Sequence, residues 1–238
     1  MDLSKVLEKE LLEGRFWTHS KTLVSGCTKV SPGCLNCWSE AMQMRFNGGK
    51  PFDGTIIEHP DRCNEILPKS EHRKPRVWTY WNDVFHEAVS EKLHHRLFAR
   101  LDVSRNDCHI ICTKRPDRAM DYFRLFPGNT KNDANLLIMV SIEDQQRIND
   151  RMPYAMKLAE MGYDVGLLCE PLLEHLNLCL DIWPVLPKWI ICGPENGKGK
   201  RPFDTDWAVG LQAQAAHKGI PFFYKAGLLN GKRYIETP

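Results

Sequence analysis

Short apolar runs rich in branched and aromatic residues recur along the chain and alternate with amphipathic stretches. Each run is four to six residues long and almost continuously apolar, a pattern typical of strands buried on both faces. The runs are Arg76–Tyr80, His109–Thr113, Leu136–Ser141, Asp164–Cys169, Trp189–Cys192 and Pro221–Tyr224. Strands that alternate with helices predict an α/β fold built on mainly parallel strands.

The stretches between the runs carry recognisable helix ends. Asp83 is predicted to cap one helix, and Pro116 to occupy the first turn of the next. Thr205 or Asp206 is predicted to cap a third helix, which Gly219 closes. The first helix has apolar residues at near-helical spacing: Val84, Ala88, Leu93, Leu97 and Leu101.

Polar residues follow one predicted strand after another. Side chains gathered at the carboxyl ends of several strands are typical of barrel enzymes, whereas a doubly wound sheet concentrates its site at one switch point. We therefore expect a single domain over residues 1–238, folded as a partial or open TIM-like β/α barrel, with a loop-rich excursion at about 47–75. A doubly wound sheet is the alternative. The polar segments are Trp81–Asp83, Lys114–Pro116, Ile142–Asp144, Glu170–Leu172, Gly193–Asn196 and Lys225.

Composition and charge narrow the class of protein only slightly. Of 238 residues, 42% are apolar and 26% charged, which is ordinary for a globular domain. Thirty-two basic and thirty acidic residues give a net charge of +2, too balanced for nucleic-acid binding driven by overall charge alone. The charged N-terminal stretch lacks the apolar run of a signal peptide, and no segment is apolar enough for a membrane helix. We expect a cytoplasmic protein without a membrane partner.

The most informative chemistry lies in the segment Gly26–Trp38, which holds Cys27, Cys34 and Cys37. Closed structural zinc sites and ferredoxin-type clusters use four protein ligands, and no fourth ligand is nearby, so one metal position would stay open. A [4Fe-4S] cluster on three thiolates can bind S-adenosylmethionine at its open iron, and one-electron reduction then releases a 5′-deoxyadenosyl radical. Zinc held with a distant histidine such as His86, or cysteines without any metal, are the alternatives.

A series of segments between Phe16 and Lys225 has a recognisable order: Gly26–Trp38, Asp83–His86, Thr113–Pro116, Val140–Glu143, Leu168–Leu172, Gly193–Asn196 with Arg201–Pro202, and Phe222–Lys225. On these segments the chain resembles a widespread phage and prophage family of unknown function, which is similar to the barrel proteins that use radical S-adenosylmethionine chemistry. Two details depart from the pattern of these proteins. The cysteine spacing is not the common one of that superfamily, and Pro194 stands where relatives tend to have a second glycine.

The resemblance implies a [4Fe-4S] cluster on Cys27, Cys34 and Cys37, with S-adenosylmethionine and an electron donor such as flavodoxin or ferredoxin as partners. Some phage enzymes of this superfamily are associated with hypermodified thymidine, which favours a nucleobase in DNA or a nucleotide as substrate, in an isomerase-type rearrangement. Two other classes stay open: a zinc-bound nucleic-acid-binding or adaptor protein without turnover, and a metal-independent hydrolase using Glu143 and Glu170.

Charge suggests roles for the polar residues that follow the strands. Lys114 suits a carboxylate or phosphate, and Glu170 can accept hydrogen bonds. Lys225 follows an apolar run, so its ammonium is expected to meet a carboxylate or a substrate anion. We predict catalytic roles for these three residues. Salt bridges at the barrel rim are the alternative for the acids. Cofactor contacts are predicted for Asp83, Ser141, Glu143, Gly193, Glu195 and Asn196.

Overall fold

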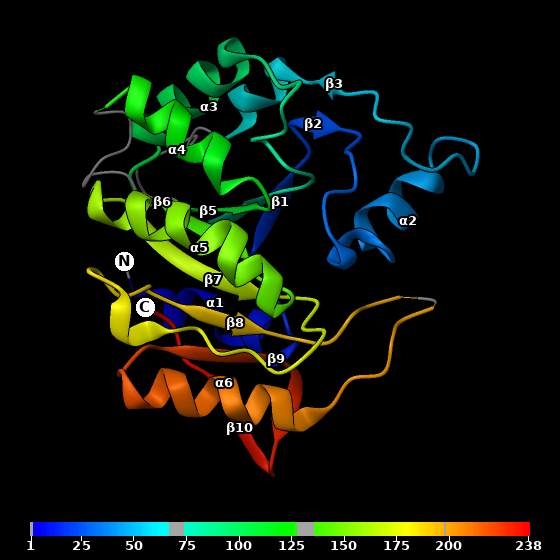
Figure 1. Ribbon diagram of the computed structural model, residues 1–238. Coiled ribbons are helices and arrows are strands. Elements are labelled where there is room, and N and C mark those ends of the chain that lie inside the picture. The colour runs from blue at the N-terminus through cyan, green and yellow to red at the C-terminus, as the bar shows by residue number, and fades with distance from the viewer. Residues whose placement is uncertain (1, 67–73, 128–135, 198) are drawn as a thin grey trace.

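The computed structural model describes residues 2–66, 74–127, 136–197 and 199–238, and it is built on one eight-stranded sheet (Figure 1). The first seven strands in sheet order are mutually parallel, and the last pairs antiparallel with its neighbour. The predicted α/β class with a mostly parallel sheet is confirmed. In sheet order the strands are β1 (His19–Lys21), β4 (Val77–Tyr80), β5 (Cys108–Thr113), β6 (Leu136–Ser141), β7 (Asp164–Cys169), β8 (Ile190–Cys192), β9 (Phe222–Leu229) and β10 (Lys232–Ile235).

The order of strands in the sheet follows their order in the chain, apart from β2 and β3, which form a separate pair. A doubly wound sheet would reverse direction at a switch point, and this sheet does not. Among the described residues the sheet is also not closed, since β1 and β10 are its two edges. The strand order therefore contradicts the doubly wound alternative, and the described strands form no closed barrel.

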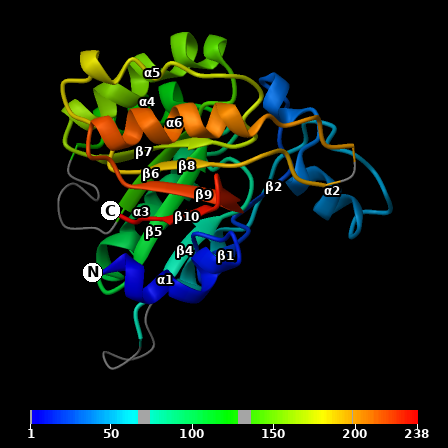
Figure 2. The same ribbon diagram turned by 90° about the horizontal axis from the view of Figure 1, so that it is seen from below.

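Helices cover both faces of the sheet. The helices α3 (Glu91–Val103), α4 (Pro116–Leu125), α5 (Gln145–Glu160) and α6 (Thr205–His217) share one apolar core with the sheet, and α1 (Leu3–Leu12) belongs to a second core. Figure 2 shows α1 on the opposite side of the strands from α4, α5 and α6. The strands are therefore buried on both faces, as their apolar runs predict.

Strand β6 shows how the sequence produces these two cores. Leu136, Ile138 and Val140 belong to the core under the helices, and Leu137 and Met139 to the core under α1. Successive side chains of a strand point to opposite faces, so an unbroken apolar run supplies both cores at once.

The helix ends match the predictions unevenly. Helix α4 begins at Pro116, as predicted. Helix α6 is capped by Asp204, one residue before the expected position. The prediction that Asp83 caps α3 is wrong, because Ser90 caps that helix and accepts a hydrogen bond from the Leu93 amide. Asp83 instead lies in the turn that follows β4, where its carboxylate has several other donors.

Between β1 and β4 the chain leaves the sheet and forms an arm, residues 24–65, beside it (Figures 1 and 2). The predicted loop-rich excursion at about 47–75 falls partly in this arm, and its residues 67–73 lie outside the described residues. None of the described helices is both long enough and apolar enough to cross a membrane. The elements of the arm are β2 (Val24–Ser25), η1 (Pro32–Cys34), α2 (Trp38–Met44), β3 (Ile57–Glu58) and η2 (Pro60–Glu65); a further short helix, η3 (Leu180–Ile182), precedes β8.

Candidate functional site

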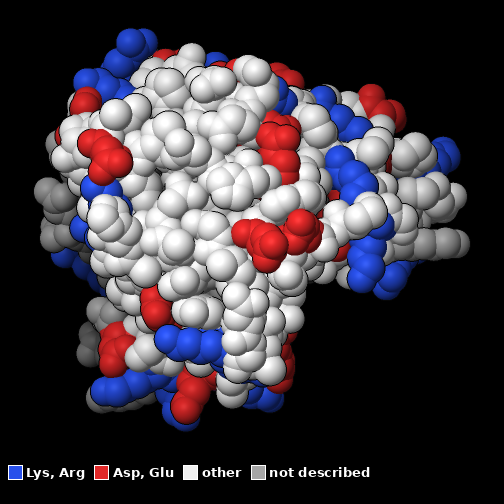
Figure 3. Space-filling model, turned by 60° about the horizontal axis from the view of Figure 1, so that its bottom comes forward, with Lys and Arg blue, Asp and Glu red and all other residues white. Residues whose placement is uncertain are grey.

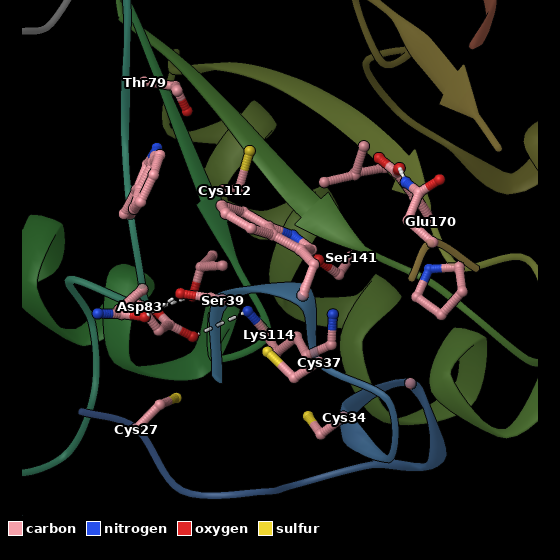
Figure 4. A pocket seen from close by; sticks show the side chains of 18 of the residues that line it. Cys27, Cys34, Cys37, Ser39, Thr79, Asp83, Cys112, Lys114, Ser141 and Glu170 are labelled. Atoms are coloured by element: carbon pink, nitrogen blue, oxygen red, sulfur yellow. Dashed lines mark hydrogen bonds between the residues drawn. The ribbon is translucent and has the colours of Figure 1, made fainter. Parts of the chain in front are cut away.

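A pocket of about 300 Å³ lies where the carboxyl ends of the parallel strands meet the cysteine loop, which we define as Gly26–Trp38 (Figure 4). Parallel strands bring their carboxyl ends to one edge of a sheet, so residues distant in sequence converge there. The volume is within the range of small-molecule and cofactor sites. Residues at or after strand ends on its wall include Asp83, Lys114, Ser141, Glu170, Glu195 and Asn196, and Lys225 lines it from within a strand.

Cys27, Cys34 and Cys37 all line this pocket, and all three are free thiols. Figure 4 shows them together on the cysteine loop, on one side of the cavity. Burial raises the pKa of Cys27, the charge of Asp83 adds to this effect, and the Arg115 guanidinium opposes it. Within the described ranges, no three His, Cys, Asp or Glu side chains form a group that could hold a metal ion.

Asp83 connects the end of β5 to the cysteine loop. Its carboxylate accepts hydrogen bonds from the Thr113 hydroxyl at 2.8 Å and the Lys114 amide at 3.0 Å, and it pairs with Arg115 at 3.1 Å. The Arg115 guanidinium also donates to the Thr28 hydroxyl at 2.7 Å and lies 3.9 Å from the Cys27 sulfur. The predicted cofactor residue Asp83 therefore lines the pocket with its charge already balanced.

Glu143 is fully buried behind the cysteine loop and does not line the pocket. Arg151 on α5 donates to its carboxylate at 2.6 Å, and the Ser31 hydroxyl of the cysteine loop donates to the other oxygen. A Cβ atom at Gly33 would lie only 2.6 Å from Glu143 Oε1. The carboxylate and the loop backbone are thus in direct contact.

Glu195 contacts the other end of the cysteine loop. Its carboxylate accepts hydrogen bonds from the Arg201 guanidinium and, at 2.8 Å, from the Asn36 amide group. Arg201 also donates to the Pro32 carbonyl oxygen at 3.0 Å. Burial opposes ionisation of Glu195, but the bonds from Arg201 and Asn36 outweigh it and lower its pKa. The Arg201 guanidinium is thus directed toward a carboxylate of the same chain.

Glu170 and Lys225 form an ion pair on the wall of the pocket. The Lys225 Nζ atom lies 2.5 Å from Glu170 Oε2, and the Asn196 side chain donates to the other carboxylate oxygen at 3.0 Å. The ammonium also lies 5.3 Å and 5.7 Å from the ring centroids of Phe16 and Trp17. The expectation that Lys225 meets a carboxylate is confirmed, although it lies within β9 rather than at the end of a strand.

The remaining predicted residues differ in their access to the pocket. Lys114 and Ser141 line it, and the Lys114 ammonium lies 4.0 Å from the Glu143 carboxylate. Gly193 does not line it; its carbonyl accepts the Leu172 amide at 2.9 Å. A Cβ atom at Gly193 would lie 3.3 Å from the Lys225 Cβ. Gly193 therefore gives Lys225 room to approach the strand end.

His86 has hydrogen-bond partners at both ring nitrogens. The Ala88 amide donates to Nδ1 at 3.1 Å, so Nε2 carries the proton and donates to the Thr28 hydroxyl at 2.9 Å. Burial and the nearby Arg115 charge lower the pKa of His86, which favours the neutral ring. The histidine considered for the zinc alternative is thus engaged with the cysteine loop.

Several contacts at the site were not predicted from the sequence, although Trp81 belongs to one of the segments expected after the strands. Trp38 and Trp81 pack edge to face at the pocket, 5.3 Å between ring centroids. The Trp81 indole N–H is buried and finds no hydrogen-bond partner among the described residues. The sequence also did not predict that Arg151 and Arg201 pair with Glu143 and Glu195. An aromatic residue directly after a strand, as at Trp81, is the sequence feature that indicates a pocket residue. Arg151 has no such feature, because it lies in the middle of a helix.

The chain belongs to the family described as "Protein of unknown function (DUF5131)", whose model matches residues 15–232. The match covers strands β1 to β9, the cysteine loop and the residues that line the pocket. No curated protein and no solved structure matches the chain.

Proposed function

We propose that this chain is a cytoplasmic radical S-adenosylmethionine enzyme whose [4Fe-4S] cluster is held by Cys27, Cys34 and Cys37. One observation carries the proposal: three free thiols from a single loop line the same pocket as the polar ends of the parallel strands. A reactive cofactor at that position would face substrate groups on several strands. The strands follow chain order around an unclosed sheet, which is the order of an open barrel.

The residues present fit the cluster in their chemistry. Thiolates are the usual protein ligands of iron–sulfur clusters, and three of them leave one iron open for S-adenosylmethionine. Arg115, close to Cys27, would offset part of the negative charge that three thiolates bring to a cluster. The indole N–H of Trp81, which is buried and has no hydrogen-bond partner in the described part of the chain, supplies a donor at the same pocket. When bound, the cluster and S-adenosylmethionine would supply a 5′-deoxyadenosyl radical.

The chain's own residues would bind and orient the ligands. Lys114 has no closely paired acid recorded in the described structure, so it suits a carboxylate or phosphate group. Glu170 and Asn196 can exchange hydrogen bonds with amino or hydroxyl groups, and Ser141 supplies a hydroxyl. Lys225 would hold the Glu170 carboxylate in place through their ion pair, and it is our candidate for moving a proton.

Anaerobic reconstitution with iron and sulfide tests the proposal directly. We expect wild-type protein to be brown and to bind about four irons per chain. Reductant together with S-adenosylmethionine should release 5′-deoxyadenosine. Cys34→Ala should lose both the chromophore and the product. Cys112→Ala is the matched control, because Cys112 lines the same pocket from β5 but is not on the cysteine loop. It should retain iron.

Colourless protein with stoichiometric zinc after anaerobic purification would contradict the proposal and favour the zinc-bound alternative. So would a cluster that Cys112→Ala removes as completely as Cys34→Ala does. Thermal denaturation with and without S-adenosylmethionine adds a second readout, because a ligand that binds the folded state raises the melting temperature.

For the substrate we propose a nucleobase, as a nucleotide or within phage DNA, undergoing an isomerase-type rearrangement, with flavodoxin or ferredoxin as electron donor. Trp17, Trp38 and Trp81 line the pocket and offer faces on which a base could stack. On the arm, Trp38 is 46% exposed and Phe46 83% exposed. Figure 3 shows Lys and Arg side chains on the side that carries the arm, as well as along the left and lower edges of this face. Exposed aromatic and basic side chains together are typical of single-stranded nucleic-acid binding.

Analysis of nucleosides from DNA replicated with and without the protein tests this substrate. We expect a modified nucleoside that appears with wild-type protein and is missing with Cys34→Ala. Fluorescence anisotropy with single-stranded DNA provides a binding test, and affinity should fall as salt rises. Unchanged nucleosides together with no DNA binding would exclude a DNA substrate while leaving the cluster chemistry standing.

A further inference from the structure

We infer that three arginine–carboxylate pairs position the cysteine loop, and that their acids serve this task rather than cofactor binding. We call them the loop clamps. Each joins a carboxylate that follows a strand to an arginine, and each pair contacts the loop at a different point. That the cysteine loop binds a metal cluster rests on the proposed function. The contacts between the arginine–carboxylate pairs and the loop do not depend on that proposal. The clamps are Asp83–Arg115, Glu143–Arg151 and Glu195–Arg201.

The cysteine loop needs such contacts because almost none of its apolar side chains is buried in a hydrophobic core. Of residues 26–38, only Gly33 and Cys34 are buried, and neither brings a large side chain to a core. Hydrophobic burial, which fixes the strands and helices, therefore cannot fix the loop. Hydrogen bonds from charged groups are the strongest local alternative.

The first clamp holds the start of the loop. Arg115 donates to the Thr28 hydroxyl at 2.7 Å and to the Thr28 carbonyl at 3.3 Å, while pairing with Asp83 at 3.1 Å. Both side chains of the pair are buried, 6% and 8% exposed. A planar guanidinium can make these contacts at once, whereas an ammonium cannot span them.

The second clamp holds the middle of the loop from behind. Arg151 donates to one oxygen of Glu143 at 2.6 Å, and Ser31 donates to the other. Gly33 packs directly on the same side chain, which leaves no space for a Cβ atom. Glu143 therefore sets both the hydrogen bonding and the closest approach of the loop to the sheet.

The third clamp holds the part of the loop on both sides of the second cysteine. Asn36 donates to Glu195 at 2.8 Å, and Arg201 donates to the Pro32 carbonyl at 3.0 Å. These two contacts flank Cys34 in the sequence. Together the three clamps touch the loop beside each of its cysteines, so they determine how the thiols face the pocket.

Hydrogen exchange of peptides covering residues 26–38, in protein purified without iron, tests this inference without any cofactor. Replacing one arginine at a time by methionine, at Arg115, Arg151 or Arg201, should speed exchange in the loop by about tenfold, because a charged hydrogen bond is lost. The matched control is Arg147→Met, which removes an α5 arginine that pairs with Asp144 and Asp150 instead. It should leave loop exchange unchanged.

Arg115→Lys separates positioning from charge balance. The ammonium keeps a positive charge beside Asp83, so the melting temperature should stay near that of wild type, while loop exchange still rises because the contacts to Thr28 are lost. If a methionine variant fails to fold, Arg115→Lys and Asn36→Ala carry the test. Loop exchange equal to wild type in these two variants, or an increase spread evenly over β5, β6 and β7, would overturn the inference.

The outcomes distinguish this inference from the proposed function. If the loop loosens in the variants but wild-type protein never binds iron, the clamps stand and the radical chemistry fails. If wild-type protein binds iron and releases 5′-deoxyadenosine while loop exchange is the same in every variant, the chemistry stands and the clamps fail.

Discussion

The Lys225 ammonium lies 2.5 Å from the Glu170 carboxylate, joining β9 to the residue that follows β7 across the intervening strand β8. Both side chains are largely buried, 13% and 14% exposed, and both line the pocket. The Glu170 carboxylate also accepts a hydrogen bond from Asn196, so this acid links the end of β7, strand β9 and the loop after β8. This pair therefore contributes to the stability of the pocket as well as to its charge.

Lys225→Met should lower the free energy of unfolding by about 2–3 kcal/mol, because Glu170 is left buried without its cation. This loss is smaller than the loss expected for a fully buried ion pair, since both groups keep some contact with water. Urea denaturation of wild type and variant measures the difference in unfolding free energy. The double variant Lys225→Met with Glu170→Gln should be less destabilised than the sum of the two single variants.

The surface pair Lys188–Asp164 is the control for this prediction. Its Nζ and Oδ1 atoms lie 3.8 Å apart, and the side chains are 51% and 62% exposed. Lys188→Met should change stability by no more than about 0.5 kcal/mol. Equal costs at Lys188 and Lys225 would show that burial of the pocket pair has no energetic consequence.

Gly33→Ala should destabilise the protein by about 1–3 kcal/mol and lower its melting temperature. Its Cβ atom would lie 2.6 Å from Oε1 and 2.8 Å from Cγ of Glu143, a buried side chain held by Arg151. Adding Glu143→Asp shortens the opposing side chain, so the double variant should recover part of the loss. If Glu143→Asp adds its full cost to that of Gly33→Ala, the two residues are not in contact.

The strands were predictable because a parallel strand that is buried on both faces has a nearly continuous run of apolar residues. The run Leu136–Ser141 matches β6 residue for residue. Strand β9 was predicted too short, since beyond Tyr224 its side chains alternate between exposed and half-buried and no longer form an apolar run. The helix cap at Ser90 was missed because Asp83 also precedes apolar residues, and only the tertiary structure shows its carboxylate bonding to the end of β5.

The polar residues of the site were predictable as a set but not in their pairing. Their position after strands brings them to one edge of the sheet, which follows from topology. Glu143 and Glu195, however, turn out to contact Ser31 and Asn36 of the cysteine loop. Such contacts span more than a hundred residues, and no local pattern in a single sequence encodes them.

Cys112 should resist alkylation in the folded protein although it lines the pocket. Burial raises its pKa to about 12, against an ordinary value of 9.0. At about pH 8 its thiolate fraction should therefore be lower by about a thousandfold than in the unfolded chain, and the thiolate is the reactive form. Iodoacetamide labelling followed by peptide mass spectrometry, with and without denaturant, measures the ratio. Equal labelling of Cys112 in the folded and unfolded states would contradict the prediction that burial suppresses its reactivity.

Glu195 should make stability depend on pH in the acid range. Burial opposes its ionisation, but the bonds from Arg201 and Asn36 prevail, so its pKa in the folded state lies below the ordinary value of 4.5. The unfolded chain then binds the proton more readily than the folded one. The stabilising contribution of Glu195 is thus complete above about pH 4.5 and is lost as the pH falls through the folded-state pKa.

The measurement is the difference in unfolding free energy between wild type and Glu195→Gln, followed from about pH 6 down to about pH 3. We expect the difference to shrink as the pH falls, because protonation removes the carboxylate that Arg201 and Asn36 contact. Glu8→Gln on the exposed side of α1 serves as the control and should give a nearly constant difference. A difference for Glu195→Gln that stays constant or grows toward acid pH would mean that the carboxylate is not held ionised by these two donors.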